Sequence, residues 1–351
     1  MALAVAALFV KLTPAAPVVE RDYSNGIYPG IDSAVRAVTG PLPFALGDVF
    51  AVLLAIALLT FYARAFGALR ARGVTGWGLT GTVVRIVART AAVAAIIGAW
   101  FLVSWGYGYS RVSLADKVPV HNERTNEDSV TAFADHVVDM MNRESAAAHA
   151  ELPIDDLAMA ARLRPPWLAT IHRLGDAASF APYRPKPTLF DRFMTASGTT
   201  GFTDPWTHEV NLASSVFPFE RPALYAHEWS HLAGFSDETE ANYIAVIACT
   251  TSHDPLLRYS GWLLIWFNLP SDLHPTHTFT RQPYDDITAV RARYLALVKP
   301  QVQAAAHDTY DHYLKANHVK AGYDSYRLFV RWLTGADYDA GGLPIVRTAA
   351  T

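Results

Sequence analysis

Charged residues and cysteine are both scarce in this chain of 351 residues. Charged side chains make up 17% of the residues and hydrophobic ones 51%, which is too apolar for an average soluble enzyme and indicates membrane spans. The one cysteine, Cys249, excludes an intramolecular disulfide, and its place on an apolar helical face favours a buried side chain over a nucleophile. A net charge of −3 and a pI of about 6.5 give no support for nucleic-acid binding.

The longest hydrophobic runs lie near the N-terminus. Residues 45–66 and 90–108 each come close to the ~20 apolar residues that a bilayer requires. Residues 2–19 form a weaker run, which Lys11 and two prolines interrupt. We therefore expect N-terminal transmembrane helices, three in number, within residues 1–109, and one sizeable folded domain over residues 110–351.

Acidic residues are absent from the connection between the two clear runs. Five arginines stand there instead: Arg64, Arg70, Arg72, Arg85 and Arg89. The positive-inside rule places such a connection in the cytoplasm, so residues 110–351 are expected on the outer side of the membrane. Histidine is likewise absent from the first 120 residues, so any zinc chemistry belongs to this outer domain.

Residues 221–233 are predicted to form a helix that carries the pattern H-E-x-x-H. A proline in the first turn and a glycine just past the end support these limits. His227 and His231 are four residues apart, so both imidazoles lie on one helical face and can reach one zinc ion. Glu228 stands beside them, where a general base can take a proton from water. The alternative is an ordinary buried helix with two histidines on its polar side.

Three acidic residues at the start of the next helix are candidates for the third zinc ligand. We prefer Glu238, with Asn242 one turn further on to orient it, over Glu240 and Asp237; Ser236 is the expected N-cap. Glu-x-x-Ala-Asn resembles the element carrying the third ligand in HtpX-like and ImmA/IrrE-like peptidases. Asp237 is considered because it completes a metzincin-like frame with Asp in place of the last His. Alternatively, all three acids merely complement the helix dipole.

The rest of the outer domain is predicted to be mainly helical with a small β element. Strand-like alternation from His208 to Leu212 precedes the motif helix, and helical patterns fill much of the remainder. Zincins place such an edge strand over the cleft, where an extended peptide can add as a further strand. The expected fold is therefore an α-helical membrane protein whose spans are followed by a zincin-like metallopeptidase domain with a small β edge.

Several further stretches resemble one known family. They are residues 23–29, 43–48, 105–111, 205–211, 227–249, 258–261 and 310–317. Together they are similar to the bacterial membrane proteins grouped as domain-of-unknown-function family 3810, whose members carry an H-E-x-x-H motif. Trp229 and Ser230 depart from the residues usual inside that motif, but they do not belong to the expected ligands. The resemblance implies a three-span protein of the bacterial cytoplasmic membrane and a zinc peptidase, and it implies no substrate.

These observations lead to one preferred function and two alternatives. The preferred function is a membrane-anchored, gluzincin-like zinc metallopeptidase acting on a peptide or protein substrate outside the membrane. An oxyanion donor is expected among Tyr259, His253, Arg258, His274 and His277, with nothing in the sequence to rank them. The alternatives are a non-enzymatic zinc-binding sensor or assembly protein, and a zinc hydrolase acting on cell-wall amides.

Overall fold

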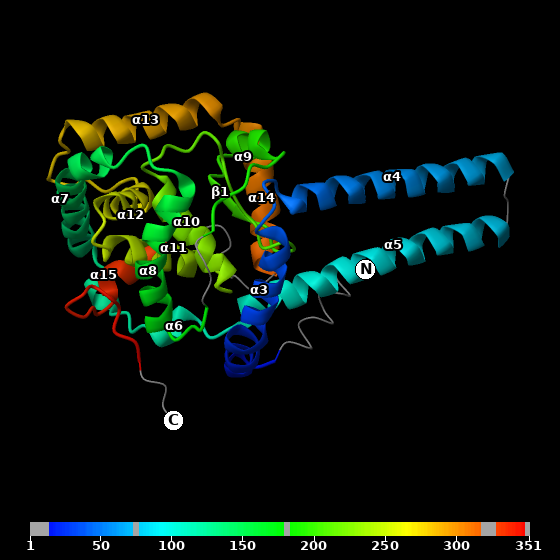
Figure 1. Cartoon of the computed structure of the whole chain (residues 1–351), viewed down its shortest axis with the longest axis horizontal. Helices are drawn as coiled ribbons and strands as arrows, with labels where there is room; N and C mark the ends of the chain where they lie inside the picture. Colours follow the sequence, from blue (N-terminus) through cyan, green and yellow to red (C-terminus); the bar gives the residue numbers. More distant parts are fainter. Residues whose placement is uncertain (1–13, 73–76, 179–182, 317–327, 348–351) are drawn as a thin grey trace.

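The computed structural model describes residues 14–72, 77–178, 183–316 and 328–347. The chain is mainly helical and contains a small two-stranded sheet. Figure 1 shows a helical body from which two long helices project side by side. Most of the predicted span over residues 2–19 lies outside the described residues.

The two projecting helices are α4 (Leu46–Arg72) and α5 (Trp77–Ser104). Both are long and apolar enough to cross a membrane, over Leu46–Arg70 and Thr80–Ser104. At a rise of 1.5 Å per residue, each such segment reaches about 37 Å, which exceeds the ~30 Å hydrocarbon core of a bilayer. Two of the predicted apolar helices are therefore present, and both extend further toward the connecting loop because the arginines there are compatible with a helix.

Three short helical segments precede α4 and pack against the body. They are α2 (Ala16–Val18), the π-helical η1 (Val19–Ile27) and α3 (Tyr28–Thr39). The hydroxyl of Tyr23 donates to the carbonyl of Val103 at 2.9 Å, and that of Tyr28 donates to Leu232 at 3.1 Å. The segment before α4 therefore belongs to the same folded body as the residues that follow α5.

The body surrounds one buried helix, α11 (Glu238–Thr250). Every residue from Glu238 to Cys249 is buried, and α11 packs against α10 (Arg221–Leu232), α8 (Asp156–Arg173), α12 (Pro255–Asn268) and α15 (Leu328–Gly335). Burial raises the pKa of the Cys249 thiol, which suits a core residue and not a nucleophile. Around this centre lie η2 (Gly106–Ser110), α6 (Leu114–Lys117), η3 (Asn122–Arg124), α7 (Glu127–Ala150), α9 (Asp191–Ser197), α13 (Arg281–Leu297) and α14 (Pro300–Ala316).

The sheet is an antiparallel hairpin of β1 (Gly201–Thr203) and β2 (Val210–Leu212), with Phe202 opposite Asn211. The predicted strand from His208 is shorter because His208 lies in the turn with a φ of +52°. Its buried ring contacts Oδ1 of Asp32 at 3.0 Å through Nδ1 and the carbonyl of Ser104 at 3.1 Å through Nε2. These contacts stabilise a backbone conformation that non-glycine residues seldom adopt.

The turn of this hairpin rests on the ends of both long helices. The backbone N–H groups of Leu46 and Gly47, at the start of α4, donate to the Glu209 carboxylate at 3.0 and 2.8 Å. At the end of α5, the hydroxyl of Ser104 donates to Pro205 at 2.8 Å, and the Trp100 indole donates to Trp206 at 3.0 Å. The hairpin is therefore fixed to the start of α4 and to the end of α5, where the two helices join the body.

Candidate metal site

Helices α10 and α11 bring two histidines and one glutamate together. His227 and His231 lie one turn apart on α10, whose observed limits closely match the predicted helix. Gly234 ends that helix with a φ of +85°, which favours glycine and lets the chain return as α11. One ligand atom from each of His227, His231 and Glu238 lies within 4.8 Å of the others.

The donor set fits a zinc ion. The Nε2 atoms of His227 and His231 lie 3.2 and 3.5 Å from Oε2 of Glu238. Two ligands on a tetrahedral zinc with bonds of about 2.0–2.2 Å lie about 3.3–3.6 Å apart. Nδ1 of His231 contacts the Phe235 carbonyl at 2.7 Å, which leaves Nε2 for a metal. Oε2 of Glu238 is buried and has no hydrogen-bond partner, as expected of an atom reserved for an ion.

The three groups also perturb one another electrostatically. Burial alone would raise the pKa of Glu238, but the imidazoles of His231 and His227 hold it well below its usual value. Burial opposes the charge on His231, whereas the Glu238 carboxylate raises its pKa to about 9. The carboxylate is therefore ionised, and a metal ion bound here would have to displace the proton from His231.

The other two acidic candidates lie in different surroundings. Glu240 accepts hydrogen bonds from the backbone of Leu114 at 2.7 Å and from the Ser113 hydroxyl at 3.2 Å. Asp237 caps α11 by accepting from the backbone N–H groups of residues 239 and 240, at 2.8 and 3.2 Å, in the position expected for Ser236. Only Glu238 of the three is grouped with the imidazoles in the part of the chain that the structure describes.

The side chain of Glu228 extends from α10 toward strand β1. Its Oε2 accepts a hydrogen bond from the Thr203 hydroxyl at 2.6 Å, and burial raises its pKa. A Cβ atom at Gly201 would lie 2.2 Å from Oε1 of Glu228, so a larger residue at this point of the strand would displace the carboxylate. The hairpin therefore sets the position of this carboxylate.

Tyr310 on α14 is a site residue that the sequence did not single out. Its hydroxyl donates to Oε1 of Glu238 at 2.5 Å, leaving Oε2 directed at the histidines. The predicted partner, Asn242, is buried, but its Nδ2 has no hydrogen-bond partner among the described residues. A helical pattern over residues 300–318 predicts this helix, but in the sequence Tyr310 stands out only as the first residue of the family resemblance at residues 310–317.

We expect Tyr310→Phe to weaken zinc binding by about 10- to 100-fold, because the variant loses the hydrogen bond that orients Glu238. Competition with a chromophoric chelator measures the affinity. Tyr294→Phe is the control, since its hydroxyl bonds to Gln303 and not to the site. Equal zinc affinity in both variants would contradict a positioning role for Tyr310.

The five residues considered as oxyanion donors are not grouped with the metal cluster. The hydroxyl of Tyr259 donates to Asp286, Arg258 pairs with Glu144 at 2.7 Å, and His277 contacts Asp139 at 2.9 Å. His253 and His274 are exposed. Although these five residues follow the motif in the sequence, the structure does not place them with the histidines.

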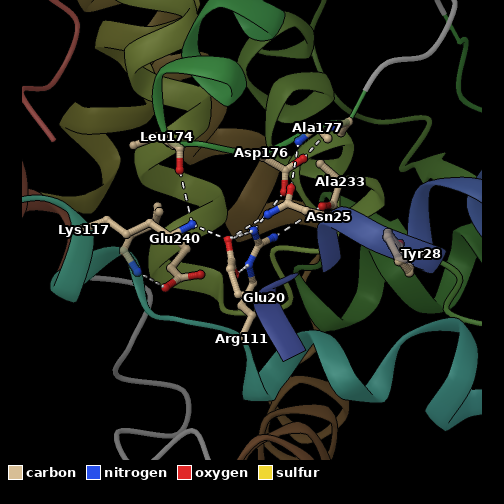
Figure 2. A network of polar contacts seen from close by, with 12 residues as sticks. Glu20, Asn25, Tyr28, Arg111, Lys117, Leu174, Asp176, Ala177, Ala233 and Glu240 are labelled. Carbon is tan, nitrogen blue, oxygen red and sulfur yellow. Dashed lines mark hydrogen bonds and ion pairs between the residues drawn. The ribbon is translucent and has the colours of Figure 1, made fainter. Parts of the chain in front are cut away.

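A buried charge network centred on Arg111 contacts the loop that follows α10 (Figure 2). Arg111 pairs with Glu20 and Asp176, each at 2.9 Å, and its guanidinium lies 3.8 Å from the centre of the Phe235 ring. Lys117 pairs with the same Glu20 at 2.5 Å. The network joins the segment before the first span to the loop that follows the motif helix.

The site also lies directly beside the end of the second span. The ring of Trp105, the first residue after α5, is 5.8 Å from the ring of His231, centre to centre. The backbone of Gly108 approaches so closely that a Cβ there would lie 2.9 Å from the Gly234 carbonyl. No spacer therefore separates the candidate metal cluster from the long helix.

Comparison with known proteins identifies the family but not the activity. The model of a family described as a protein of unknown function (DUF3810) matches residues 23–334, which include both long helices, the hairpin, α10 and α11. The chain belongs to this family, as the resemblance in its sequence predicted. No curated protein and no solved structure matches it.

Proposed function

We propose that this protein is a membrane-anchored zinc metallopeptidase with a zincin-like outer domain. The observation that carries the proposal is the convergence of His227, His231 and Glu238, with the Glu228 carboxylate buried beside them. A merely structural zinc site usually has four protein ligands and needs no carboxylate base, whereas three ligands leave a position open for chemistry.

The chemistry would be divided between the metal and the chain. When bound, zinc supplies Lewis acidity toward a peptide carbonyl and lowers the pKa of water. Glu228 would accept the proton of the attacking water and pass it to the leaving amine. Its raised pKa makes Glu228 a stronger base toward the attacking water than an ordinary carboxylate would be. Thr203 would hold the carboxylate in place through its hydroxyl.

Strand β1 supports a substrate in extended form. The pairing of Phe202 with Asn211 directs the backbone groups of Gly201 and Thr203 away from β2. A peptide can add to such an edge as a further strand, and Gly201 and Thr203 are the residues that contact Glu228. This arrangement favours an extended peptide over a sugar.

The test of this function is zinc content measured with turnover. Full-length protein should contain about one zinc per chain and should cleave at least one member of a panel of unfolded proteins. His227→Ala should lose both zinc and cleavage, because two protein ligands hold the ion poorly. Full zinc without cleavage would support a non-enzymatic sensor, and cleavage of cell-wall fragments alone would support the amide hydrolase. A gel for self-cleavage should accompany the panel.

We further propose that the connection between α4 and α5 is cytoplasmic and that the body lies outside the bacterial membrane. The five arginines lie in the connected halves of α4 and α5, with no acidic residue among them, and support this orientation. Reporter fusions after Arg72 and after Lys117 should give opposite signals, the second being extracytoplasmic. A cytoplasmic signal after Lys117 would reverse the orientation.

A further inference from the structure

Three large apolar side chains are exposed together at the start of α9. Leu189, Phe190 and Phe193 are 73%, 50% and 54% exposed. The opposite side of this helix is anchored, because Met194 is buried with Ala213 and Val216. Leu189, Phe190 and Phe193, here called the α9 patch, therefore project from the body on a fixed element. An apolar cluster held outward in this way marks an interaction site.

The α9 patch is tied to the first turn of the first span. Asp48 of α4 accepts a hydrogen bond from the Thr188 hydroxyl at 2.9 Å and from the backbone N–H of Leu189 at 2.7 Å. Asp48 itself is buried, so this tie is not a surface contact. The patch therefore begins next to the residues where α4 would enter the bilayer.

Exposed apolar surface continues from the α9 patch onto the span itself. Phe44, Val49 and Phe50 are 45%, 39% and 47% exposed. Figure 1 shows α9 and α14 on the side of the body from which α4 projects. This side is also where the hairpin turn contacts Trp100 and Ser104, near the end of the other span. One side of the body therefore faces the membrane that the two helices would cross.

We propose that the α9 patch inserts into the outer leaflet, so that the body rests on the lipid surface and does not stand away from it. The chemistry of the patch fits this partner. Leucine and phenylalanine suit the boundary between headgroups and acyl chains, and the exposed Arg192 beside Phe193 suits lipid phosphate. The proposal rests on α4 and α5 crossing the bilayer, and it is independent of zinc and of peptide hydrolysis.

Insertion can be measured by fluorescence quenching on the full-length chain in lipid vesicles. Phe193→Cys is labelled with a bimane fluorophore, and Leu157→Cys on α8 is the matched control, because the two native side chains are 54% and 53% exposed. The native Cys249 is fully buried, so unsubstituted protein serves as the background. Vesicles of phosphatidylcholine and phosphatidylglycerol are prepared with and without brominated acyl chains, and iodide is added as an aqueous quencher.

We expect brominated lipid to remove about half of the fluorescence at position 193 and none at 157, with iodide acting in the reverse order. Equal quenching at the two positions by both agents would overturn the proposal. Protection of position 193 from both quenchers would also overturn it, because protein, such as a second copy of the chain, would then cover the α9 patch.

Discussion

Glu228→Gln is expected to abolish peptide hydrolysis while the protein keeps its shape and its zinc. Glutamine is isosteric and can still accept the hydrogen bond from Thr203, but it cannot take a proton from water. General-base catalysis contributes about 10²–10⁴-fold, so turnover should fall by at least about a hundredfold. Zinc per chain and turnover on the same preparation are the two measurements. Turnover at the wild-type rate would rule out the proposed mechanism.

Glu240→Gln is the matched control for this experiment. Glu240 is also buried and also lies near the motif, but it faces Leu114 and Ser113 and not the imidazoles. Burial and the nearby Asp237 raise its pKa to about 7, so the neutral glutamine resembles a form that the native residue readily adopts. Glu240→Gln should therefore keep both zinc and turnover. Loss of zinc in this variant would instead favour Glu240 as the third ligand.

Arg111→Ala is expected to have the largest effect on stability. The Arg111 side chain is only 2% exposed, and its removal leaves the carboxylates of Asp176 and Glu20, which are 1% and 14% exposed, without this partner. Breaking one side of a buried ion pair costs about 3–5 kcal/mol, because the remaining charge stays desolvated. For a body of this size the thermal midpoint in detergent should fall by roughly 10 °C.

Arg162→Ala provides the comparison for Arg111. Arg162 also contacts two carboxylates, those of Glu151 and Asp254, but its side chain is 42% exposed. Water screens such contacts, and exposed pairs contribute about 1 kcal/mol or less. The midpoint of this variant should therefore stay within a few degrees of wild type. Equal shifts in the two variants would show that the buried network does not stabilise the body.

Local sequence signals were sufficient for the elements that carry the candidate metal ligands. The spacing of His227 and His231, the proline of the first turn and the glycine after the last predicted a helix over residues 221–233, and the structure has it over Arg221–Leu232. The apolar runs likewise predicted α4 and α5, although α4 continues past residue 66 to Arg72, and α5 begins at Trp77 instead of 90 and ends at Ser104 instead of 108. Periodicity and capping act within a few residues, so a single sequence displays them.

Contacts between distant segments could not be predicted in this way. Tyr310 reaches Glu238 across 72 residues, and Glu240 meets Leu114 across 126. Even the cap of α11 differed, since both Ser236 and Asp237 are good capping residues and only the packed chain selects Asp237. Which of three neighbouring acids faces the imidazoles depends on helix packing, and the preference for Glu238 came from the Glu-x-x-Ala-Asn resemblance and not from capping or periodicity.

The pairing of Arg111 with Glu20 has a consequence for how the chain is assembled during synthesis. The two residues lie on opposite sides of the α4–α5 pair in the sequence, and so do Asp32 and His208. With the proposed topology, the pair of crossings returns the chain to its starting side, so these partners cannot meet while only one of the two helices is inserted. A chain that stalls with one helix inserted holds the two halves in different compartments. In that topology, the Arg111–Glu20 and Asp32–His208 contacts couple completion of the body to insertion of the second helix once the first has entered the membrane.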